Sequence, residues 1–137
     1  MNGLTTYLNF DGKTREAMKF YQECLGGELY LMPFSEVQFD YPQKAKDRIM
    51  HACLKSGSLN LMASDTCPGM PFQQGNNFAI SVDCGSNEEI ERLFSALGNK
   101  GKVTMALHDA FWGSRFGMVV DQFGISWMFN YQKAKQN

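Results

Sequence analysis

The sequence runs twice through the same order of predicted elements, and this internal repeat restricts the possible folds more than any other feature. Each half reads as a strand, an amphipathic helix and three further strands. The first half covers about residues 1–64 and the second about 77–132, with a linker at about 65–76 that holds two prolines and two glycines. Because one half of this size cannot bury its own sheet, we expect the halves to complete one core and to form a single domain over residues 1–137.

The predicted elements of the first half rest on apolar spacing and on turn residues. Apolar side chains recur at i, i+3, i+4, i+7 and i+8 from Ala17 to Leu25, which predicts a helix with one buried stripe. Gly26-Gly27 ends this helix, because glycine accepts a left-handed cap. Strands are predicted at residues 5–10, 28–34, 48–55 and 59–64, with a polar loop at 35–47 and a hairpin turn at 56–58.

The second half repeats this order and has its own helix signal. Ser86 is followed three residues later by Glu89, a capping box that predicts the start of a helix. Gly98 is the predicted end of that helix. Strands are predicted at residues 77–83, 102–107, 115–120 and 125–131.

Composition narrows the class of protein and of partner. With 44% hydrophobic and 20% charged residues, the chain is typical of a globular protein. A net charge of -1 without a block of like charges gives no electrostatic reason to expect a nucleic-acid or membrane partner. The first residues lack a signal-peptide pattern, no apolar run reaches the ~20 residues of a membrane span, and the four cysteines are widely spaced, so we expect a cytoplasmic protein.

Segments near both ends of the chain carry a resemblance to a known family. They are Tyr7–Gly12, Ala17–Tyr21 and Leu25–Leu29 near the start, and Ala110–Gly113, Arg115–Asp121, Phe123-Gly124 and Trp127-Met128 near the end. Together these segments resemble PhnB-like proteins of the vicinal oxygen chelate (glyoxalase/bleomycin-resistance) superfamily. The resemblance implies an α+β fold in which two βαβββ modules form a cupped mixed β-sheet, usually in a homodimer.

PhnB-like proteins are often described as 3-demethylubiquinone-9 3-methyltransferases, and the sequence argues against methyl transfer. A methyltransferase of the usual α/β type holds S-adenosylmethionine at a glycine-rich turn after its first strand. Residues 81–87 begin in a similar way, but they lack the second and third glycines of such a turn. Because the capping box already accounts for Ser86, we expect no such cofactor.

The resemblance also implies where a metal ion would bind. Superfamily enzymes hold a divalent ion with four side chains, one from the first and one from the last strand of each module. Aligning the strand starts and the glycine turns places these positions at Thr5, Leu61, Asn77 and Met128. The usual ligands are His, Gln and Glu, whereas these residues offer a hydroxyl, no donor, an amide and a thioether. We therefore expect no metal ion and no other cofactor.

His51 is the first candidate for a rebuilt metal site. It shares a strand face with Cys53, and this pair could contribute to a zinc site if two more ligands joined it. The alternative interpretation of His51 is a hydrogen-bonded cavity or interface residue. Trp112, in a glycine-flanked aromatic loop, is either a lid over the cavity, an anchor at a dimer interface or a loop residue that plugs the core.

If the four aligned positions mark the inner face of the cup, strand alternation extends that face. The candidate cavity residues are Thr5, Tyr7, Asn9, His51, Leu61, Asn77, Trp112 and Met128. Further positions predicted on this face are Leu59, Ala63, Ala79, Ser81, Ser126 and Asn130. Such a surface is apolar with a few hydroxyl and amide groups, which suits a small, partly apolar molecule.

These features favour a metal-free member of the superfamily that binds a small organic molecule in its sheet cavity. A second hypothesis is a lyase, isomerase or dioxygenase whose metal site has moved to His51. A third is a dimeric structural or interaction module whose cavity is filled by side chains.

Overall fold

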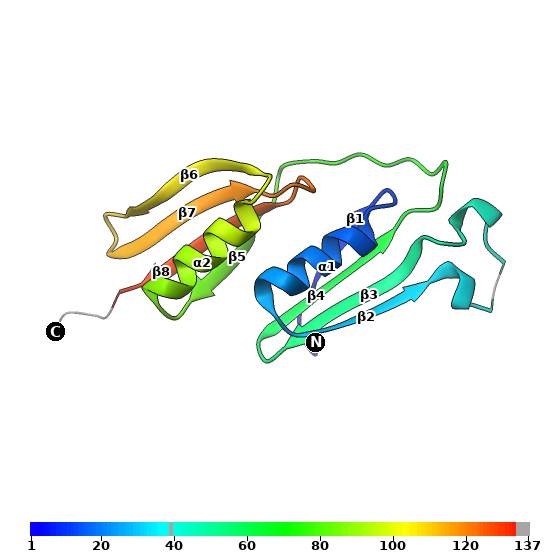
Figure 1. Ribbon diagram of the computed structural model, residues 1–137, viewed down its shortest axis with the longest axis horizontal. Helices are drawn as coiled ribbons and strands as arrows, with labels where there is room; N and C mark the ends of the chain where they lie inside the picture. Colours follow the sequence, from blue (N-terminus) through cyan, green and yellow to red (C-terminus); the bar gives the residue numbers. More distant parts are fainter. Residues whose placement is uncertain (39, 134–137) are drawn as a thin grey trace. The chain divides into compact units, whose positions relative to one another are not determined.

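The chain runs twice through strand, helix and three strands, in the order that the repeat predicts (Figure 1). The computed structural model describes residues 1–38 and 40–133 and divides into two units, Met1–Gln73 and Gln74–Asn137. The boundary falls inside the predicted linker, and each unit holds one mixed four-stranded sheet and one helix. That the two units make a single domain stays a prediction.

Unit 1 pairs its first strand with its last. Its elements are β1 (Thr6–Phe10), α1 (Thr14–Leu25), β2 (Glu28–Pro33), β3 (Ile49–Ser56) and β4 (Leu59–Asp65), with the 3-10 turns η1 (Phe34–Glu36) and η2 (Gln43–Ala45) between β2 and β3. The strand order is β1-β4-β3-β2, in which β1 runs parallel to β4 and the other pairs are antiparallel. The core consists mainly of Ala17, Met18 and Tyr21 from α1 and Leu8, Leu54, Leu61 and Ala63 from the sheet.

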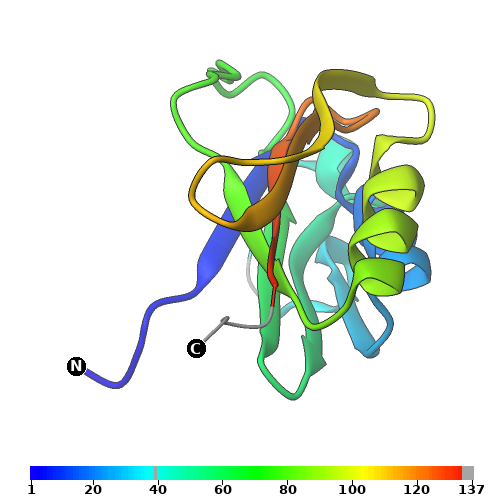
Figure 2. The same cartoon turned by 90° about the vertical axis from the view of Figure 1, so that its left-hand side faces the viewer.

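Unit 2 has the same topology. Its elements are β5 (Ile80–Cys84), α2 (Asn87–Gly98), β6 (Lys102–Asp109), β7 (Ser114–Val120) and β8 (Ser126–Gln132), in the sheet order β5-β8-β7-β6. In Figure 2, α2 lies on one side of the strands of its sheet. The core consists of Ile90, Leu93 and Leu97 from the helix and Val119, Trp127 and Phe129 from the sheet. Neither helix of the described chain is long and apolar enough to cross a membrane.

The pairing register gives positions in unit 1 a counterpart in unit 2. Leu61 of β4 and Trp127 of β8 are both buried, and each pairs with the first residue of the parallel edge strand. Successive side chains of a strand point to opposite faces. The next residues, Met62 and Met128, therefore occupy equivalent places on the face that the helix leaves open.

A buried carboxylate ties three segments of unit 1 together. Asp65, at the end of β4, is 7% exposed and accepts hydrogen bonds from the backbone N–H groups of Gly12, Thr14 and Ile49 at 2.9–3.0 Å. These groups belong to the β1–α1 turn, the start of α1 and the start of β3. Asp65 thus fixes the end of the sheet against the helix that covers it.

The predicted start of the fifth strand is wrong by three residues. The sequence predicts a strand over residues 77–83, but β5 begins at Ile80, Asn77 lies in a bend and Phe78 is 49% exposed. The reason lies in the partner strand, because Ile80 pairs with Trp127 and β8 begins one residue earlier. Residues 77 and 78 therefore have no strand beside them, although the alternation of polar and apolar residues in the sequence begins at residue 77.

Candidate functional site

The face of the first sheet that α1 leaves uncovered is the first candidate site, and we call it the open face of unit 1. It carries Thr5, Tyr7 and Asn9 from the β1 segment, Asn60, Met62 and Ser64 from β4, His51 and Cys53 from β3, and Tyr30 and Met32 from β2. Every one of these side chains is exposed or half-buried. The face thus mixes aromatic, thioether, amide and hydroxyl groups.

Tyr7 and His51 form a pair across this open face. The Tyr7 hydroxyl lies 3.1 Å from His51 Nδ1, and the two rings stack with centroids 5.9 Å apart and planes at 28°. Because β4 lies between β1 and β3, the two side chains meet above the middle strand. Alternation relates Tyr7 to Asn9 and His51 to Cys53 on their own strands, and the pairing of β4 with both β1 and β3 brings Tyr7 and His51 together.

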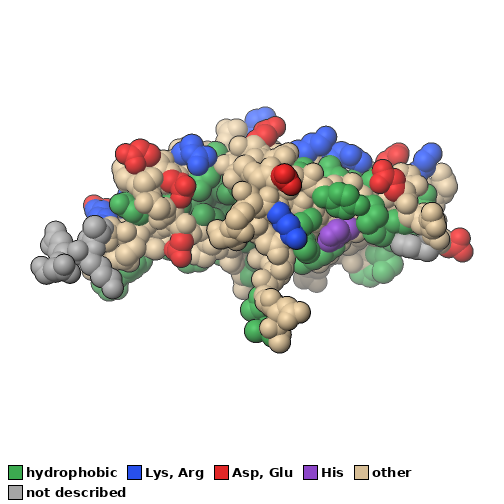
Figure 3. Space-filling view, turned by 90° about the horizontal axis from the view of Figure 1, so that it is seen from below, with side chains coloured by type: hydrophobic (Ala, Val, Ile, Leu, Met, Phe, Trp, Pro, Cys, Tyr) green, Lys and Arg blue, Asp and Glu red, His purple; other side chains and the backbone are tan. Residues whose placement is uncertain are grey.

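Polar side chains on both sides of this pair bond to each other. The Asn60 amide donates to Thr5 Oγ1 at 3.0 Å, and the Ser64 hydroxyl donates to Asn9 Oδ1 at 3.5 Å. The Cys53 thiol lies 3.9 Å from Asn60 Oδ1. Figure 3 shows a histidine at the surface with hydrophobic side chains against it, as a partly apolar binding surface requires.

Leu61 does not belong to this face, and its prediction as a cavity residue is wrong. It is 2% exposed and lies in the core with its neighbour Ala63, which is fully buried. The error comes from aligning two hairpins of different lengths. Residue 56 pairs with 59 in the first hairpin, whereas 120 pairs with 126 in the second, so the shared glycines do not mark equivalent positions. A shift of one residue turns a side chain to the other face.

The longer loop of the second hairpin is stabilised by Asp121. This carboxylate is 3% exposed. It accepts hydrogen bonds from the backbone of Phe123 and Ile125 and from the Trp127 indole, all at 2.8–3.0 Å. The first hairpin has a two-residue turn instead and needs no such support.

The open face of unit 2 carries different side chains at the matching positions. Met128 and Asn130 of β8 lie there with Ser81 and Asp83 of β5, and the Asn130 amide donates to Asp83 at 3.3 Å. This bond repeats the Ser64–Asn9 contact of unit 1. Met128 is thus on the face where the sequence places it, whereas Asn77 precedes β5 and is exposed.

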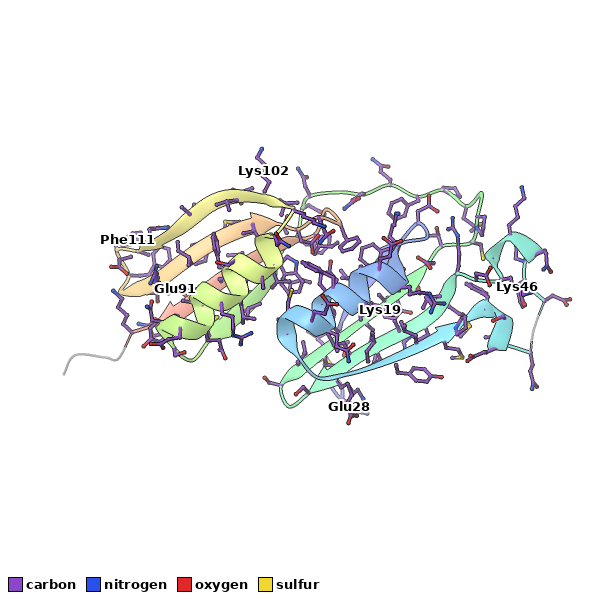
Figure 4. All side chains as sticks on the ribbon, in the orientation of Figure 1. Lys19, Glu28, Lys46, Glu91, Lys102 and Phe111 are labelled. Carbon is purple, nitrogen blue, oxygen red and sulfur yellow. The ribbon has the colours of Figure 1, made fainter. Side chains whose placement is uncertain are left out.

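Trp112 belongs to an aromatic group at one end of unit 2. Its ring packs edge-on against Phe116 of β7 at 5.7 Å and against Phe111 at 5.0 Å, and His108 packs against the same Phe116 at 6.4 Å. Trp112 is 50% exposed and Phe111 98%. Figure 4 shows Phe111 at the loop between β6 and β7. Phe116 is not among the predicted site residues, although alternation along β7 places it on the same face as Met118.

A shallow polar groove of about 640 Å³ also lies in unit 2, beside the start of α2. It is lined mainly by Asn87, His108, Asp109, Arg115, Tyr131 and Lys133. Its charges are paired, because Arg115 contacts Glu91 at 2.9 Å and Lys133 contacts Asp109 at 2.7 Å. The hydrogen bond from Lys133 holds the pKa of Asp109 below its usual range. Arg115 of β7 is therefore engaged with α2, and the cations that line the groove are paired rather than free for an anionic ligand.

The residues at the superfamily's metal positions do not fit a divalent ion. Leu61 is buried, so the open-face position that corresponds to Met128 is held by Met62. Both of these side chains offer a thioether. Divalent ions of the usual enzymes prefer imidazole nitrogen or carboxylate oxygen. Across residues 1–38 and 40–133, no three His, Cys, Asp or Glu side chains gather to hold a metal ion.

The β5–α2 turn, which superficially resembles a cofactor-binding turn, is a helix cap. Ser86 Oγ accepts a hydrogen bond from the Glu89 N–H at 3.1 Å, and the Glu89 carboxylate accepts one from the Gly85 N–H at 3.0 Å. The capping box predicted from the sequence is thus confirmed. Ser86 and Glu89 are both occupied in starting α2.

Comparison with solved structures defines the class of protein. A glyoxalase/bleomycin resistance protein/dioxygenase family enzyme from Burkholderia phytofirmans PsJN matches with a TM-score of 0.63, over 93% of this chain and 97% of that one. The sequence identity is 14%, so this likeness concerns the fold. The chain has the α+β fold of glyoxalase/bleomycin-resistance proteins, built from two βαβββ modules.

The particular family follows from closer matches. The family model described as 3-demethylubiquinone-9 3-methyltransferase matches residues 2–129, and the chain belongs to this PhnB-like family. Protein YjdN of Escherichia coli (strain K12) is 34% identical, over 96% of this chain and 97% of its own length. The crystal structure of protein PA1353 from Pseudomonas aeruginosa is 42% identical with a TM-score of 0.88, covering 96% and 98%. A PhnB protein from Bacillus cereus is 27% identical with a TM-score of 0.76, covering 95% and 99%.

Proposed function

We propose that the chain binds a small, partly apolar organic molecule on the open face of its sheets, without the divalent metal ion of superfamily enzymes. The observation that carries this proposal is the pair Met62 and Met128 at equivalent positions of the two modules. A thioether at both of these positions takes the place of the nitrogen or oxygen ligands that a divalent ion needs, and it supplies flexible apolar surface instead. Methionine packs well against irregular or aromatic partners.

The polar groups around Met62 support binding of a molecule that also carries hydrogen-bonding atoms. Tyr7 and His51 lie to one side of it, and Asn60 offers an amide on the other. Pockets for small molecules commonly combine a largely apolar lining with a few placed polar groups. The role of Tyr7 and His51 in this proposal is to orient the ligand.

A thermal-shift screen of small metabolites tests the proposal, because a ligand that binds the folded state alone raises the melting temperature. We expect at least one compound to stabilise the chain and the substitution Met62→Lys to abolish that shift. Ser95→Lys, on the exposed side of α2, is the matched control and should retain it. If Met62→Lys keeps the full shift, the ligand does not lie on the open face of unit 1.

Elemental analysis of protein purified without chelator decides between this proposal and an enzyme with a relocated divalent metal. The observation that favours such an enzyme is the position of His51 and Cys53 on one half-exposed strand face. We expect less than a tenth of an equivalent of zinc, nickel, manganese or iron. Near-stoichiometric metal that is lost in His51→Ala would overturn the proposed function in favour of a metal-dependent enzyme.

Two further properties accompany the proposal. We propose a homodimer, which the exposed apolar side chains of unit 2 support, and a cytoplasmic location, which the four free cysteines support.

Methyl transfer is not part of the proposal. Calorimetry with S-adenosylmethionine is expected to show no binding, and micromolar binding would contradict that expectation.

A further inference from the structure

Four side chains with nitrogen or sulfur donors lie next to one another on the open face of unit 1. His51 and Cys53 are two residues apart on β3, about 6.5–7 Å along the strand, and point to the same side. Met62 is the direct antiparallel partner of Cys53, so their Cβ atoms are about 4.5–5.5 Å apart. Met32 is in turn the partner of His51. These distances suit side chains that converge on one small ion.

The Tyr7 hydroxyl orients the imidazole for such a role. Its contact of 3.1 Å engages Nδ1, which leaves Nε2 as the ring nitrogen that can bind an ion. Histidines that bind metal ions commonly use their second nitrogen to donate a hydrogen bond of this kind, and the bond fixes the tautomer and the ring orientation. The Tyr7–His51 contact therefore has the form of an outer support for a metal ligand.

The donor set selects the class of ion. An imidazole, a thiolate and a thioether form a soft group, and thiolate and thioether ligands favour Cu(I). Calcium and magnesium take about six or more oxygen ligands, commonly carboxylates, whereas the oxygen atoms beside these donors belong to the Tyr7 and Ser64 hydroxyls and the Asn60 amide. A structural zinc ion takes four ligands from Cys, His, Asp or Glu, and the thioether of Met62 is not one of these.

We propose that His51, Cys53 and Met62 bind one Cu(I) ion. The ligands are His51 Nε2, the Cys53 thiolate and the Met62 sulfur, and the Cys53 thiol releases its proton to solvent when the ion binds. This proposal goes beyond the proposed function, because it concerns a soft monovalent ion in place of an organic molecule, although both use His51 and Met62. It differs in ligand type from the four-residue divalent site of the superfamily, and two of its three ligands, His51 and Cys53, come from β3, which contributes none of those four positions.

Unit 2 supplies an internal comparison. Phe116, Met118 and Met128 stand at the places that His51, Cys53 and Met62 occupy in unit 1. Since this second face has no thiolate, its thioethers are expected to bind Cu(I) much more weakly.

The other cysteines are poor competitors for the ion. Cys24 and Cys84 are buried, and burial raises the pKa of Cys84 to about 11. Cys67 is half-buried in the segment after β4 and provides the control for an isolated accessible thiol.

Anaerobic titration of the whole chain with Cu(I), in competition with a chromophoric chelator, tests the site. We expect one equivalent to resist the chelator. Loss of outer supports costs metal sites about 10–100-fold in affinity. Cys53→Ser and His51→Ala, which remove ligands, should therefore weaken binding by at least about 100-fold, and Tyr7→Phe by about tenfold. Met62→Leu should weaken binding, whereas Met128→Leu and Cys67→Ser should leave it unchanged.

Circular dichroism of the metal-free variants establishes that each one is folded. The inference is overturned if the parent chain yields all its Cu(I) to the chelator, if Cys53→Ser binds like the parent, or if Met128→Leu weakens binding as much as Met62→Leu. Equal affinity for zinc in the same competition assay would overturn the assignment to a soft ion. The thermal-shift screen for an organic ligand is carried out on the metal-free chain and is therefore a separate test.

Discussion

At the scale of single residues, Asp65 holds more of unit 1 together than any other polar side chain described above. Its buried carboxylate accepts three backbone hydrogen bonds, and each donor would be left without this partner if the carboxylate were removed. Bonds to a charged group contribute about 1.5–3 kcal/mol each and are not additive. We expect Asp65→Ala to lower the free energy of unfolding by about 3 kcal/mol, measured by denaturant titration.

Asp83 provides the matched control for this change. It is an exposed carboxylate near the end of β5, and its recorded side-chain bond is a single one from Asn130 at 3.3 Å. Exposed polar residues usually change stability by no more than about 0.5 kcal/mol when substituted. A loss in Asp65→Ala no greater than that in Asp83→Ala would contradict the structural role of Asp65.

Asp11 is a residue whose titration reports a specific contact. Arg48 donates to it at 2.7 Å, and this hydrogen bond lowers the pKa of Asp11 below its usual value of about 3.9. Because the pKa is lower in the native state than in the unfolded state, the contact stabilises the fold at pH values above the unfolded pKa. This contribution is lost below about pH 4, as the pH falls through the native pKa. NMR titration should show the pKa of Asp11 rising toward its usual value in Arg48→Gln. An unchanged value would mean that the two side chains do not interact in solution.

At the scale of elements, the start of α2 offers a test of local stabilisation. Ser86 accepts the Glu89 N–H, and removal of a serine cap typically costs about 1 kcal/mol. We expect Ser86→Ala to lower the free energy of unfolding by about this amount. Ser95→Ala, at an exposed position inside the same helix, should be neutral or slightly stabilising because alanine is the better helix former. Equal effects in the two variants would show that the cap contributes nothing.

Local signals explain which elements could be predicted from the sequence. The helices, the first hairpin and the capping box depend on residues close together in the chain, and their predictions hold. The start of β5 and the face of Leu61 depend on pairing with distant residues. The β8 strand determines where β5 begins, and the Asp121 loop makes the second hairpin longer than the first. A glycine alone therefore could not set the alignment of the two modules.

The features of the candidate site also divide into those that depend on one strand and those that depend on pairing between distant strands. Strand alternation predicts that Tyr7 shares a face with Asn9 and that His51 shares one with Cys53, because each pair lies on a single strand. The 3.1 Å contact between Tyr7 and His51 needs the order β1-β4-β3, which brings the two side chains together across β4. The sequence had aligned Leu61 with Met128, so the equivalence of Met62 with Met128 becomes visible only in the sheet register.

At the scale of the whole molecule, the two modules share a scaffold and differ on their open faces. Tyr7, His51 and Cys53 of unit 1 correspond to Ser81, Phe116 and Met118 of unit 2. The covered faces of both sheets remain apolar because they pack against a helix. Function resides in sites placed on a fold. The two modules therefore keep one scaffold while their open faces present different side chains.

The proposed homodimer gives a prediction for the whole chain. Phe111 is 98% exposed, and the described contact of its ring is with Trp112, which is itself 50% exposed. Exposed apolar groups of this kind often mark contact surfaces between proteins. By light scattering, we expect a mass of about twice the 15.5 kDa of the chain. Phe111→Ser should shift that mass toward the monomer, because an apolar anchor is replaced by a small polar group.

The matched control for Phe111→Ser is Met70→Ser. Met70 is also an exposed apolar residue, at 60%, but it belongs to the segment after β4 in unit 1 and is not a member of the aromatic group. It should leave the mass unchanged, which would separate a specific anchor from a general loss of surface hydrophobicity. A monomeric mass for the parent chain at high micromolar concentration would contradict the dimer. A dimer that persists in Phe111→Ser would instead place its interface elsewhere on the chain.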